Sequence, residues 1–331
     1  MKSYVRKNEA YQSMPFMPTI IEHAAYTVGQ TPSAAAQDAY IMAQAHIEAY
    51  KLYRPDAVTV GMDIYNIEAE ALGCQIRFYN DESIPGIITH PLSLDSDPCQ
   101  IVFSTGLGRI QLMLSAATAV KASIGSHVRV SVGICGPFSV LIELLGFEAA
   151  IHAFVDRDER VVPLLMAILE FQKDYCTAVF NCGLGVTVFE SWASPPLATP
   201  EIYLQYALPY EQALFAHMKA LGLSARPLVI GGDTRTLLDY IAETGTTLLV
   251  SDYNTPLQLY VDKAMAKGLT VRANIDPKMV LGGAFDEVET RVEEIYAQYK
   301  VYPKLVIGTG VVPYDTPPVN LLRVKNIINN M

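Results

Sequence analysis

The run VRVSVGI, residues 128–134, is apolar, rich in β-branched side chains and of the length of one strand. Such a run is typical of a strand that is buried on both faces of a parallel sheet. Seven further runs of this kind follow one another along the chain, at 17–21, 57–60, 186–189, 228–230, 247–250, 269–273 and 305–307. The sequence therefore predicts eight buried strands.

Helical stretches fill the gaps between these runs. Five of them begin with a capping residue followed by proline, a pair in which the side chain accepts a free backbone N–H and proline takes the first helical position. The pairs are Thr31-Pro32, Thr199-Pro200, Thr255-Pro256, Asp276-Pro277 and Thr316-Pro317. After the first pair, Tyr40, Ala43, Ile47 and Tyr50 recur at helical spacing. Pro209 lies inside the helix that begins near Pro200 and should kink it.

Eight strands that alternate with helices predict an α/β fold, a (β/α)8 TIM barrel. We expect one domain over residues 1–331, with an irregular excursion at about 74–107 after the second strand. A length of 331 residues would also allow two domains, but the strand–helix units use the whole chain.

The composition and charge of the chain exclude several classes of protein. The chain has 24 basic and 34 acidic residues, a formal charge of −10, with 51% hydrophobic and 18% charged residues. Disordered chains are poorer in apolar residues, and nucleic-acid binders usually carry a basic excess. The five cysteines form no CxxC pair, and the apolar runs are too short to span a membrane. We therefore expect a cytoplasmic protein that binds neither nucleic acid nor membrane.

In TIM barrels the active site lies at the C-terminal ends of the strands. Polar residues that follow the predicted strands are therefore the candidates for the site. They are Glu22, His23, Asp63, Tyr65, Cys135, Glu190, Ser191, Asp233, Asp252, Tyr253, Asn274 and Asp276. Several carboxylates at one end of a barrel are costly unless they bind protons, a cation or a polar ligand. Glu68 and Glu70, in the segment IEAEALG, are further acids near the second strand end.

Several of these segments resemble the uroporphyrinogen decarboxylase superfamily, and most of all its corrinoid-dependent methyltransferase branch, which includes the methylcobamide:coenzyme M methyltransferases. The similar segments run in the same order through nearly the whole chain. They are PTIIEHAAYTVG (18–29), DAVTVGMDIYNIEAEALGC (56–74), FESWASPPLATPEIYLQYALPY (189–210), IGGDT (230–234), ANIDP (273–277) and IGTGVVPYDTPPVN (307–320). The resemblance implies a barrel with a deep, partly apolar mouth, and Asp63 matches the superfamily's active-site aspartate.

Two departures from this resemblance distinguish the subfamily. The arginine-rich N-terminal motif of the decarboxylases is replaced by NEAYQSMPFMP (8–18). The coenzyme M methyltransferases hold a thiol-activating zinc with a His-x-Cys and a later Cys, but the aligned positions here are Val229, Gly231 and Val311. The resemblance then favours the donor-side enzymes, O-demethylase methyltransferase I components, which move a methyl group onto a separate corrinoid protein. A different site, in which carboxylates and His23 hold zinc or another divalent ion, is an alternative that the sequence leaves open.

The resemblance thus implies that a corrinoid, carried by a partner protein, accepts the methyl group of a small donor, for which we expect a methoxylated aromatic. An ether oxygen is a poor leaving group without a proton, so the site needs an acid. We assign catalysis to Asp63, Glu190 and His23, and substrate binding to Tyr65, Ser191, Asp233, Asp252, Tyr253 and Asn274. Each of these residues could instead cap a helix or pack in the core. Two other functions stay open: a decarboxylase of a tetrapyrrole or smaller carboxylate, and a non-catalytic barrel that binds a corrinoid protein.

Overall fold

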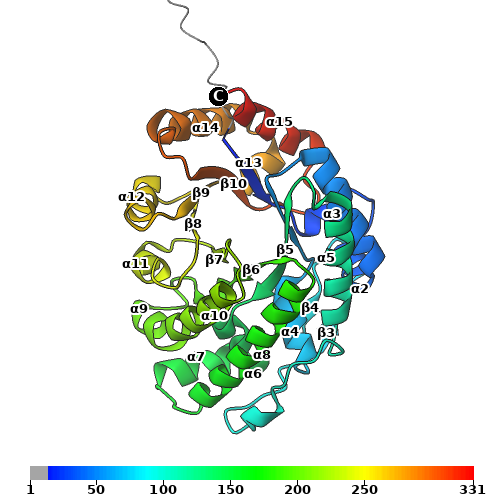
Figure 1. Ribbon diagram of the computed structural model, residues 1–331, viewed down its shortest axis with the longest axis vertical. Helices are drawn as coiled ribbons and strands as arrows, with labels where there is room; N and C mark the ends of the chain where they lie inside the picture. Colours follow the sequence, from blue (N-terminus) through cyan, green and yellow to red (C-terminus); the bar gives the residue numbers. More distant parts are fainter. Residues whose placement is uncertain (1–13) are drawn as a thin grey trace, which may run out of the picture.

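The computed structural model describes residues 14–331, so residues 8–13 of NEAYQSMPFMP lie outside it. Eight parallel strands form the centre of the molecule, and a ring of helices surrounds them (Figure 1). The strands are β1 (Phe16–Thr19), β2 (Ala57–Val60), β5 (Arg129–Cys135), β6 (Gly185–Phe189), β7 (Leu228–Val229), β8 (Leu248–Ser251), β9 (Thr270–Ile275) and β10 (Leu305–Val311). Each overlaps one run of the sequence, so the predicted barrel is confirmed.

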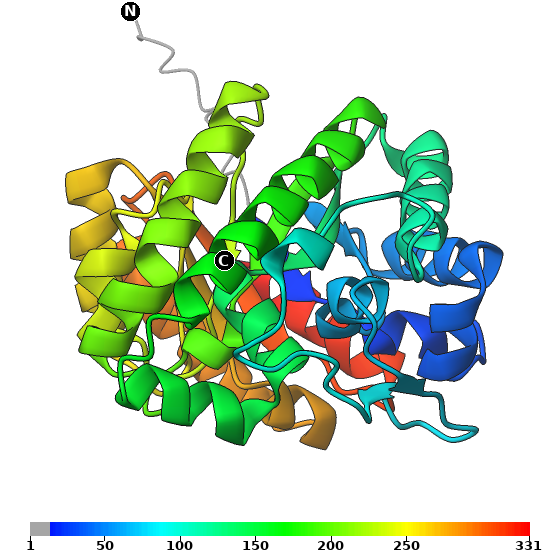
Figure 2. The same ribbon diagram turned by 90° about the horizontal axis from the view of Figure 1, so that it is seen from below.

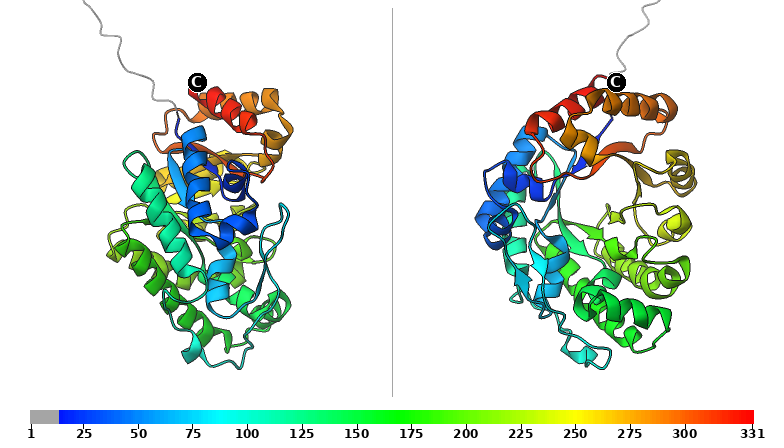
Figure 3. Two further views of the ribbon diagram at one scale, coloured as in Figure 1. Left: turned by 90° about the vertical axis from the view of Figure 1, so that its right-hand side faces the viewer. Right: turned by 180° about the vertical axis from the view of Figure 1, so that it is seen from behind.

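Backbone hydrogen bonds order these strands as two four-stranded sheets, β1-β10-β9-β8 and β2-β5-β6-β7. Two further bonds join the sheets into a ring. Asp56 donates its N–H to the carbonyl of Phe16 at 2.9 Å between β2 and β1, and Thr247 donates to Arg226 at 3.0 Å between β8 and β7. The first and last strands, β1 and β10, therefore lie side by side, as Figure 3 also shows.

The helices lie outside the strands and cover them. In chain order they are α1 (Glu22–Tyr26), α2 (Pro32–Gln37), α3 (Ala39–Tyr53), α4 (Ile64–Ala71), α5 (Ile110–Ile124), α6 (Pro137–Leu145), α7 (Phe147–Val155), α8 (Val161–Asn181), α9 (Pro200–Ile202), α10 (Leu208–Ala220), α11 (Leu238–Ile241), α12 (Leu257–Lys267), α13 (Pro277–Gly282), α14 (Phe285–Tyr299) and α15 (Pro318–Asn329). Short 3-10 helices are η1 (Pro98–Gln100), η2 (Ser191–Ala193) and η4 (Arg235–Leu237). Among residues 14–331, no single helix is long and apolar enough to span a membrane, and the pair α6 and α7, which together would be, is bent by 117°.

Three of the five predicted caps are confirmed: Thr31, Thr199 and Asp276 each accept a backbone N–H at a helix start. The prediction is wrong for Thr255 and Thr316. There the helix begins one residue later and proline itself takes the capping position, while the Thr255 hydroxyl donates to the carbonyl of Asp252 at 2.8 Å.

Two other helix predictions need correction in detail. Asp38 separates α2 from α3, so Tyr40 lies in the first turn of a new helix and is 72% exposed, whereas Ala43, Ile47 and Tyr50 are buried as expected. The distortion expected at Pro209 takes the form of a π-helical turn, η3 (Tyr203–Ala207), between α9 and α10. A π-turn is one of the usual causes of a helix distortion. Beyond this turn, α10 lies beside α8 (Figure 2).

The segment 74–107 crosses the outside of the barrel with little regular structure. It contains a short antiparallel pair, β3 (Ile76–Arg77) and β4 (Gly86–Ile87), and the turn η1. Side chains of the barrel helices hold it in place: Asn66 of α4 donates to the carbonyl of Pro85 at 2.7 Å, and the hydroxyl of Ser33 in α2 accepts the N–H of Tyr79 at 2.8 Å.

The ring leaves no room for a side chain at Gly308 of β10. A Cβ there would lie 2.7 Å from the carbonyl oxygen of Met17 and 2.6 Å from the Cδ of Arg272. Gly308→Ala should therefore lower the free energy of unfolding by about 1–3 kcal/mol, the usual cost of overpacking, as measured by urea denaturation. Gly282→Ala is the control, because a Cβ there meets nothing within 4 Å. If both variants were as stable as the wild type, the packing of β10 between β1 and β9 would be looser than described.

Candidate functional site

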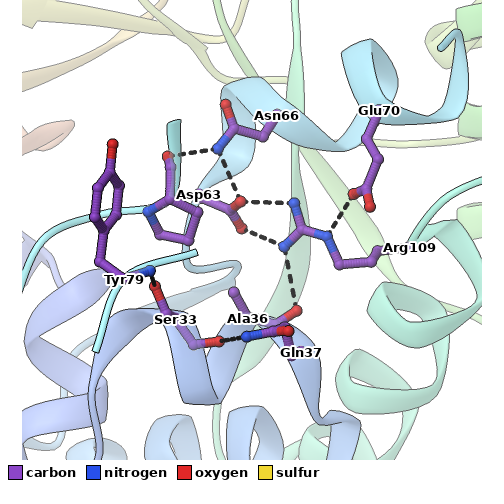
Figure 4. A network of polar contacts seen from close by, with 9 residues as sticks. Ser33, Ala36, Gln37, Asp63, Asn66, Glu70, Tyr79 and Arg109 are labelled. Carbon is purple, nitrogen blue, oxygen red and sulfur yellow. Dashed lines mark hydrogen bonds and ion pairs between the residues drawn. The ribbon is translucent and has the colours of Figure 1, made fainter. Parts of the chain in front are cut away.

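Asp63 lies at the C-terminal end of β2 and is buried in an ion pair with Arg109 (Figure 4). Arg109 Nη1 donates to Oδ1 at 2.9 Å and Nη2 donates to Oδ2 at 2.7 Å, a bidentate arrangement. Asn66 adds a third hydrogen bond to Oδ2 at 2.9 Å. Burial raises the pKa of the Asp63 carboxyl, and the bonds from Arg109 oppose this rise. Both carboxylate oxygens are therefore occupied by protein groups.

Arg109 is the site residue that the sequence analysis missed. Its Nε donates to Glu70 at 2.5 Å and its Nη1 to the carbonyl of Ala36 at 3.2 Å, so one guanidinium joins α2, α4 and the start of α5. Gly108, with φ +47°, lets the chain pass close to the backbone of α4 just before Arg109. The only signal in the sequence is an arginine directly before the apolar face of 110–124.

His23 lies in α1, directly after β1; it is fully buried, and both of its ring nitrogens have partners. Nδ1 lies 2.9 Å from the carbonyl oxygen of Tyr314, and Nε2 lies 2.8 Å from the hydroxyl of Tyr53. Burial lowers the pKa of the imidazole. A satisfied core histidine holds α1 and α3 together but offers no free nitrogen to a substrate, so the geometry favours a positioning role for His23.

Glu190 follows β6 and is fully buried at the start of α6. Its Oε1 accepts the backbone N–H of Ser139 at 2.7 Å, while Oε2 has no partner among residues 14–331. Burial raises the pKa of this carboxyl to about 7, and hydrogen bonds from the helix backbone oppose the rise. Gly136 is required beside it, because any Cβ at that position would overlap the Glu190 carboxylate.

Glu68 of α4 forms a second buried acid next to Glu190. Its Oε1 accepts the N–H of Cys135 at 2.8 Å, and its Oε2 is unpartnered within the described part of the chain. Burial raises the pKa of Glu68 to about 8, and the charge of Glu190 adds to that rise. Burial likewise raises the pKa of the Cys135 thiol well above its usual value. This region therefore holds protons at neutral pH, which disfavours a thiolate.

Tyr65 and Ser191 meet above these acids, and their hydroxyl groups form a hydrogen bond. The ring of Tyr65 packs edge-on against Phe189, with the ring centres 6.4 Å apart. Phe189 in turn packs with Ile21, which follows β1, and with Ile64, which follows β2. Tyr65 and Ser191, each predicted to bind substrate, thus lie together beside an apolar surface and place one polar group on it.

Glu22 adds an acid that the sequence analysis placed at the mouth but did not assign to catalysis. It follows β1, is 8% exposed, and forms no ion pair within residues 14–331. Burial raises the pKa of its carboxyl to about 7, opposed only by the hydrogen bond from its own backbone N–H. Unlike Glu190, Glu22 keeps some access to solvent, and this combination suits a proton donor.

The remaining predicted residues lie at the ends of β7, β8 and β9. Asp233 is exposed and pairs with Arg235 at 2.5 Å, which lowers the pKa of its carboxyl. Asp252 accepts the N–H of Asn254 at 2.9 Å in a local turn. Burial raises the pKa of Tyr253, and the charges of Asp276 and Asp252 add to that rise. Asn274 is buried, with an Oδ1 atom that has no partner in the described chain. Asn274 therefore keeps hydrogen-bonding capacity, while Asp233 and Asp252 have local partners.

The sequence matches the uroporphyrinogen decarboxylase (URO-D) family over residues 4–331. The chain belongs to the uroporphyrinogen decarboxylase family. Similar curated proteins include a "Methylcobamide:CoM methyltransferase MtbA" of Methanosarcina mazei, 27% identical over 100% of this chain and 99% of the relative. A "Uroporphyrinogen decarboxylase" of Hyphomonas neptunium is 24% identical over 91% of this chain and 85% of its own.

A solved structure supports the same fold for this family member. It is a "methyltransferase from Methanosarcina mazei", with a TM-score of 0.84 and 20% sequence identity, covering 97% of this chain and 95% of that one. The similarity extends over the whole barrel, which agrees with the family match.

The three positions at which the resemblance implies zinc ligands carry no side chain that can bind a metal. Val229 lies on β7, Gly231 follows it, and Val311 ends β10; none has a donor atom on its side chain. Among residues 14–331, no group of three His, Cys, Asp or Glu side chains is arranged to hold a metal. The residues at these positions therefore do not fit a zinc ion.

The Asp63–Arg109 pair should dominate the stability of this end of the barrel. Arg109→Met leaves the Asp63 charge buried without a partner, so the free energy of unfolding should fall by about 3–5 kcal/mol in urea denaturation. The double variant Asp63→Leu with Arg109→Met should recover part of this loss, since no orphan charge remains. Arg235→Gln, which breaks the exposed pair with Asp233, is the control and should change little. Equal effects of Arg109→Met and Arg235→Gln would contradict this reading.

The raised pKa of Glu22 makes stability depend on pH. Between about pH 4.5 and 7 the unfolded chain ionises this carboxyl while the folded protein keeps it protonated, so stability is lost as pH rises. Glu22→Gln should make the decline in the free energy of unfolding shallower over this window, by about 1.4 kcal/mol for each unit of pKa difference removed. Urea denaturation at several pH values measures it. An unchanged slope would show that Glu22 is ionised in the folded protein.

Proposed function

We propose that this protein is a corrinoid-dependent methyltransferase. It takes a methyl group from a small donor, for which we propose a methoxylated aromatic, and transfers it to the cobalt(I) of a corrinoid held by a separate partner protein. The full-length family match and the full-length similarity to a protein named methylcobamide:CoM methyltransferase support the methyltransferase part of this proposal.

One observation carries the choice of the donor-side reaction: the site offers acids and not a thiolate. Glu22, the first residue of α1, has a pKa that burial raises to about 7, so it can give a proton at neutral pH. The positions that would hold a thiol-activating zinc are Val229, Gly231 and Val311. An acceptor thiol would therefore lack activation, whereas a leaving oxygen would find a proton.

The proposed reaction is a displacement at the methyl carbon. The bond between this carbon and the ether oxygen breaks with its electron pair staying on oxygen, while a bond from carbon to cobalt forms with the electron pair of cobalt(I). The leaving oxygen takes a proton from the Glu22 carboxyl, so a phenol departs instead of a phenolate. Acid assistance of this kind contributes about 10²–10⁴-fold to a rate.

Other residues of the site would position the donor. The linked hydroxyls of Tyr65 and Ser191 can hold the oxygen of the donor, and the face of Phe189 can receive an aromatic ring. Asn274 and Tyr253 would bind the donor from the opposite side of the barrel. We propose positioning roles for Asp63, through Arg109, and for Glu190, through the start of α6, because protein groups occupy their carboxylates wholly or in part.

Methylation of cobalt, followed by absorbance, tests the proposal. The protein is mixed with a cobalt(I) corrinoid protein and a panel of methoxyarenes. Glu22→Gln should slow transfer by about 10²–10⁴-fold with a phenol of high pKa as leaving group, and much less with an acidic nitrophenol, which departs without a proton. Glu148→Gln, an exposed acid in the first turn of α7, is the control and should be as fast as wild type.

Three outcomes would contradict the proposal. Equal losses with both leaving groups would remove Glu22 from acid catalysis while leaving methyl transfer intact. Carbon dioxide release from a porphyrinogen or a smaller carboxylate would identify a decarboxylase. Binding of the corrinoid protein without methylation from any donor would indicate a non-catalytic barrel.

A further inference from the structure

Arg272 of β9 is a buried cation for which residues 14–331 supply no counter-ion. It is 8% exposed, lies inside the barrel, and forms no hydrogen bond or ion pair with any residue between 14 and 331. Its Nε atom is shielded from solvent and has no acceptor. Gly308 makes room for its aliphatic stem, since a Cβ there would lie 2.6 Å from Cδ. Burial lowers the pKa of the guanidinium to about 10, so it stays charged at neutral pH.

A cavity of about 610 Å3 lies beside Arg272 at the N-terminal end of the strands, opposite the mouth. The starts of β5 and β6 and the turn before β7 surround it. This volume is within the range of about 300–1,000 Å3 that is usual for small-molecule sites. Small residues such as Ala57 and Gly185 leave the space open. The barrel is thus hollow at its lower end.

The charges that line this lower cavity are all basic. Arg272 lies at its inner end, Lys121 and Arg129 also line it, and no Asp or Glu does. This is unexpected in a chain with a formal charge of −10. Arg129 is exposed and forms no ion pair among residues 14–331. The cavity therefore favours an anion.

Three hydroxyl groups line the same cavity close to its inner end. Ser131 Oγ lies 3.0 Å from the hydroxyls of both Thr59 and Thr187, which are 3.4 Å from each other. All three residues line the cavity together with Arg272. Hydroxyls can turn to donate to a ligand, and a guanidinium binds the oxygens of carboxylate or phosphate in pairs.

We propose that the lower cavity is a second ligand site, for a small molecule with an oxyanion group, a phosphate or a carboxylate, which pairs with Arg272. A buried cation without a partner is strongly unfavourable, and its retention inside the barrel is explained by an anion that enters from this end. The rim residues Lys121 and Arg129 attract the anion, and the hydroxyls of Thr59, Ser131 and Thr187 bind its remaining oxygens. This site is separate from the mouth and does not depend on the proposed methyl transfer.

Calorimetric titration of the full-length protein with inorganic phosphate, and separately with acetate, tests this site. A titration with sodium chloride at equal ionic strength is the reference. At least one oxyanion should bind to wild type, and its affinity should fall at least 10-fold in Arg272→Gln and by a smaller factor in Thr187→Val. Arg323→Gln removes a cation that lies over Phe285 and does not line the cavity; it is the control and should bind like wild type. Urea denaturation without added anion should show that Arg272→Gln is at least as stable as wild type, because the unpaired charge is gone.

The two probes also distinguish the class of ligand: tighter binding of phosphate favours a phosphorylated ligand, and tighter binding of acetate a carboxylate. The proposal is overturned if neither ion binds better than chloride, or if Arg272→Gln binds both as well as wild type does. Loss of stability in Arg272→Gln would equally contradict it, since the arginine would then have a structural partner. Methyl transfer at the mouth is measured independently, so the two proposals can fail separately.

Discussion

The bidentate pair of Asp63 and Arg109 is the contact on which the upper wall of the barrel depends. Each of these charges would cost several kcal/mol to withdraw from water, and only the full set of hydrogen bonds offsets that cost. Arg109 reaches Asp63, Glu70 and the carbonyl of Ala36, so it fixes three helices around the end of β2. Tyr65 lies in the first turn of one of these helices, α4, and its position follows from the same pair.

Burial of the acids at the mouth makes the charge of the folded protein differ from the formal charge of its composition. The formal charge of −10 counts every carboxyl as ionised. Glu22, Glu68 and Glu190 have pKa values of about 7 or 8, so they are partly or largely protonated at neutral pH. These three buried glutamates therefore carry less negative charge than the composition implies, whereas Asp63 and Asp233 are paired with arginines. A site of this kind favours reactions in which a leaving group gains a proton.

The sequence allowed the barrel to be predicted, because each strand is a local run of apolar residues. The order of candidate residues along the strand ends could be predicted for the same reason. The partners of these residues could not. Asp63 and Arg109 are 46 residues apart, and nothing near either one indicates that they meet. Arg272 is missed for a similar reason, because the lack of a partner for it among residues 14–331 depends on neighbours from several strands. Thr255 and Thr316 failed as caps because the neighbouring proline occupied the position instead.

The segment 74–107 has a consequence for how such a protein can diverge. The carbonyl of Pro85 in this segment accepts a hydrogen bond from Asn66, which lies in the first turn of α4 at the mouth. The segment contributes no strand to the ring. Changes in the length of the turn between β3 and β4 leave the backbone hydrogen bonds of the barrel intact. The excursion and the ring of strands are therefore held by different contacts, and the length of the excursion can vary without a change in the hydrogen bonds that close the barrel.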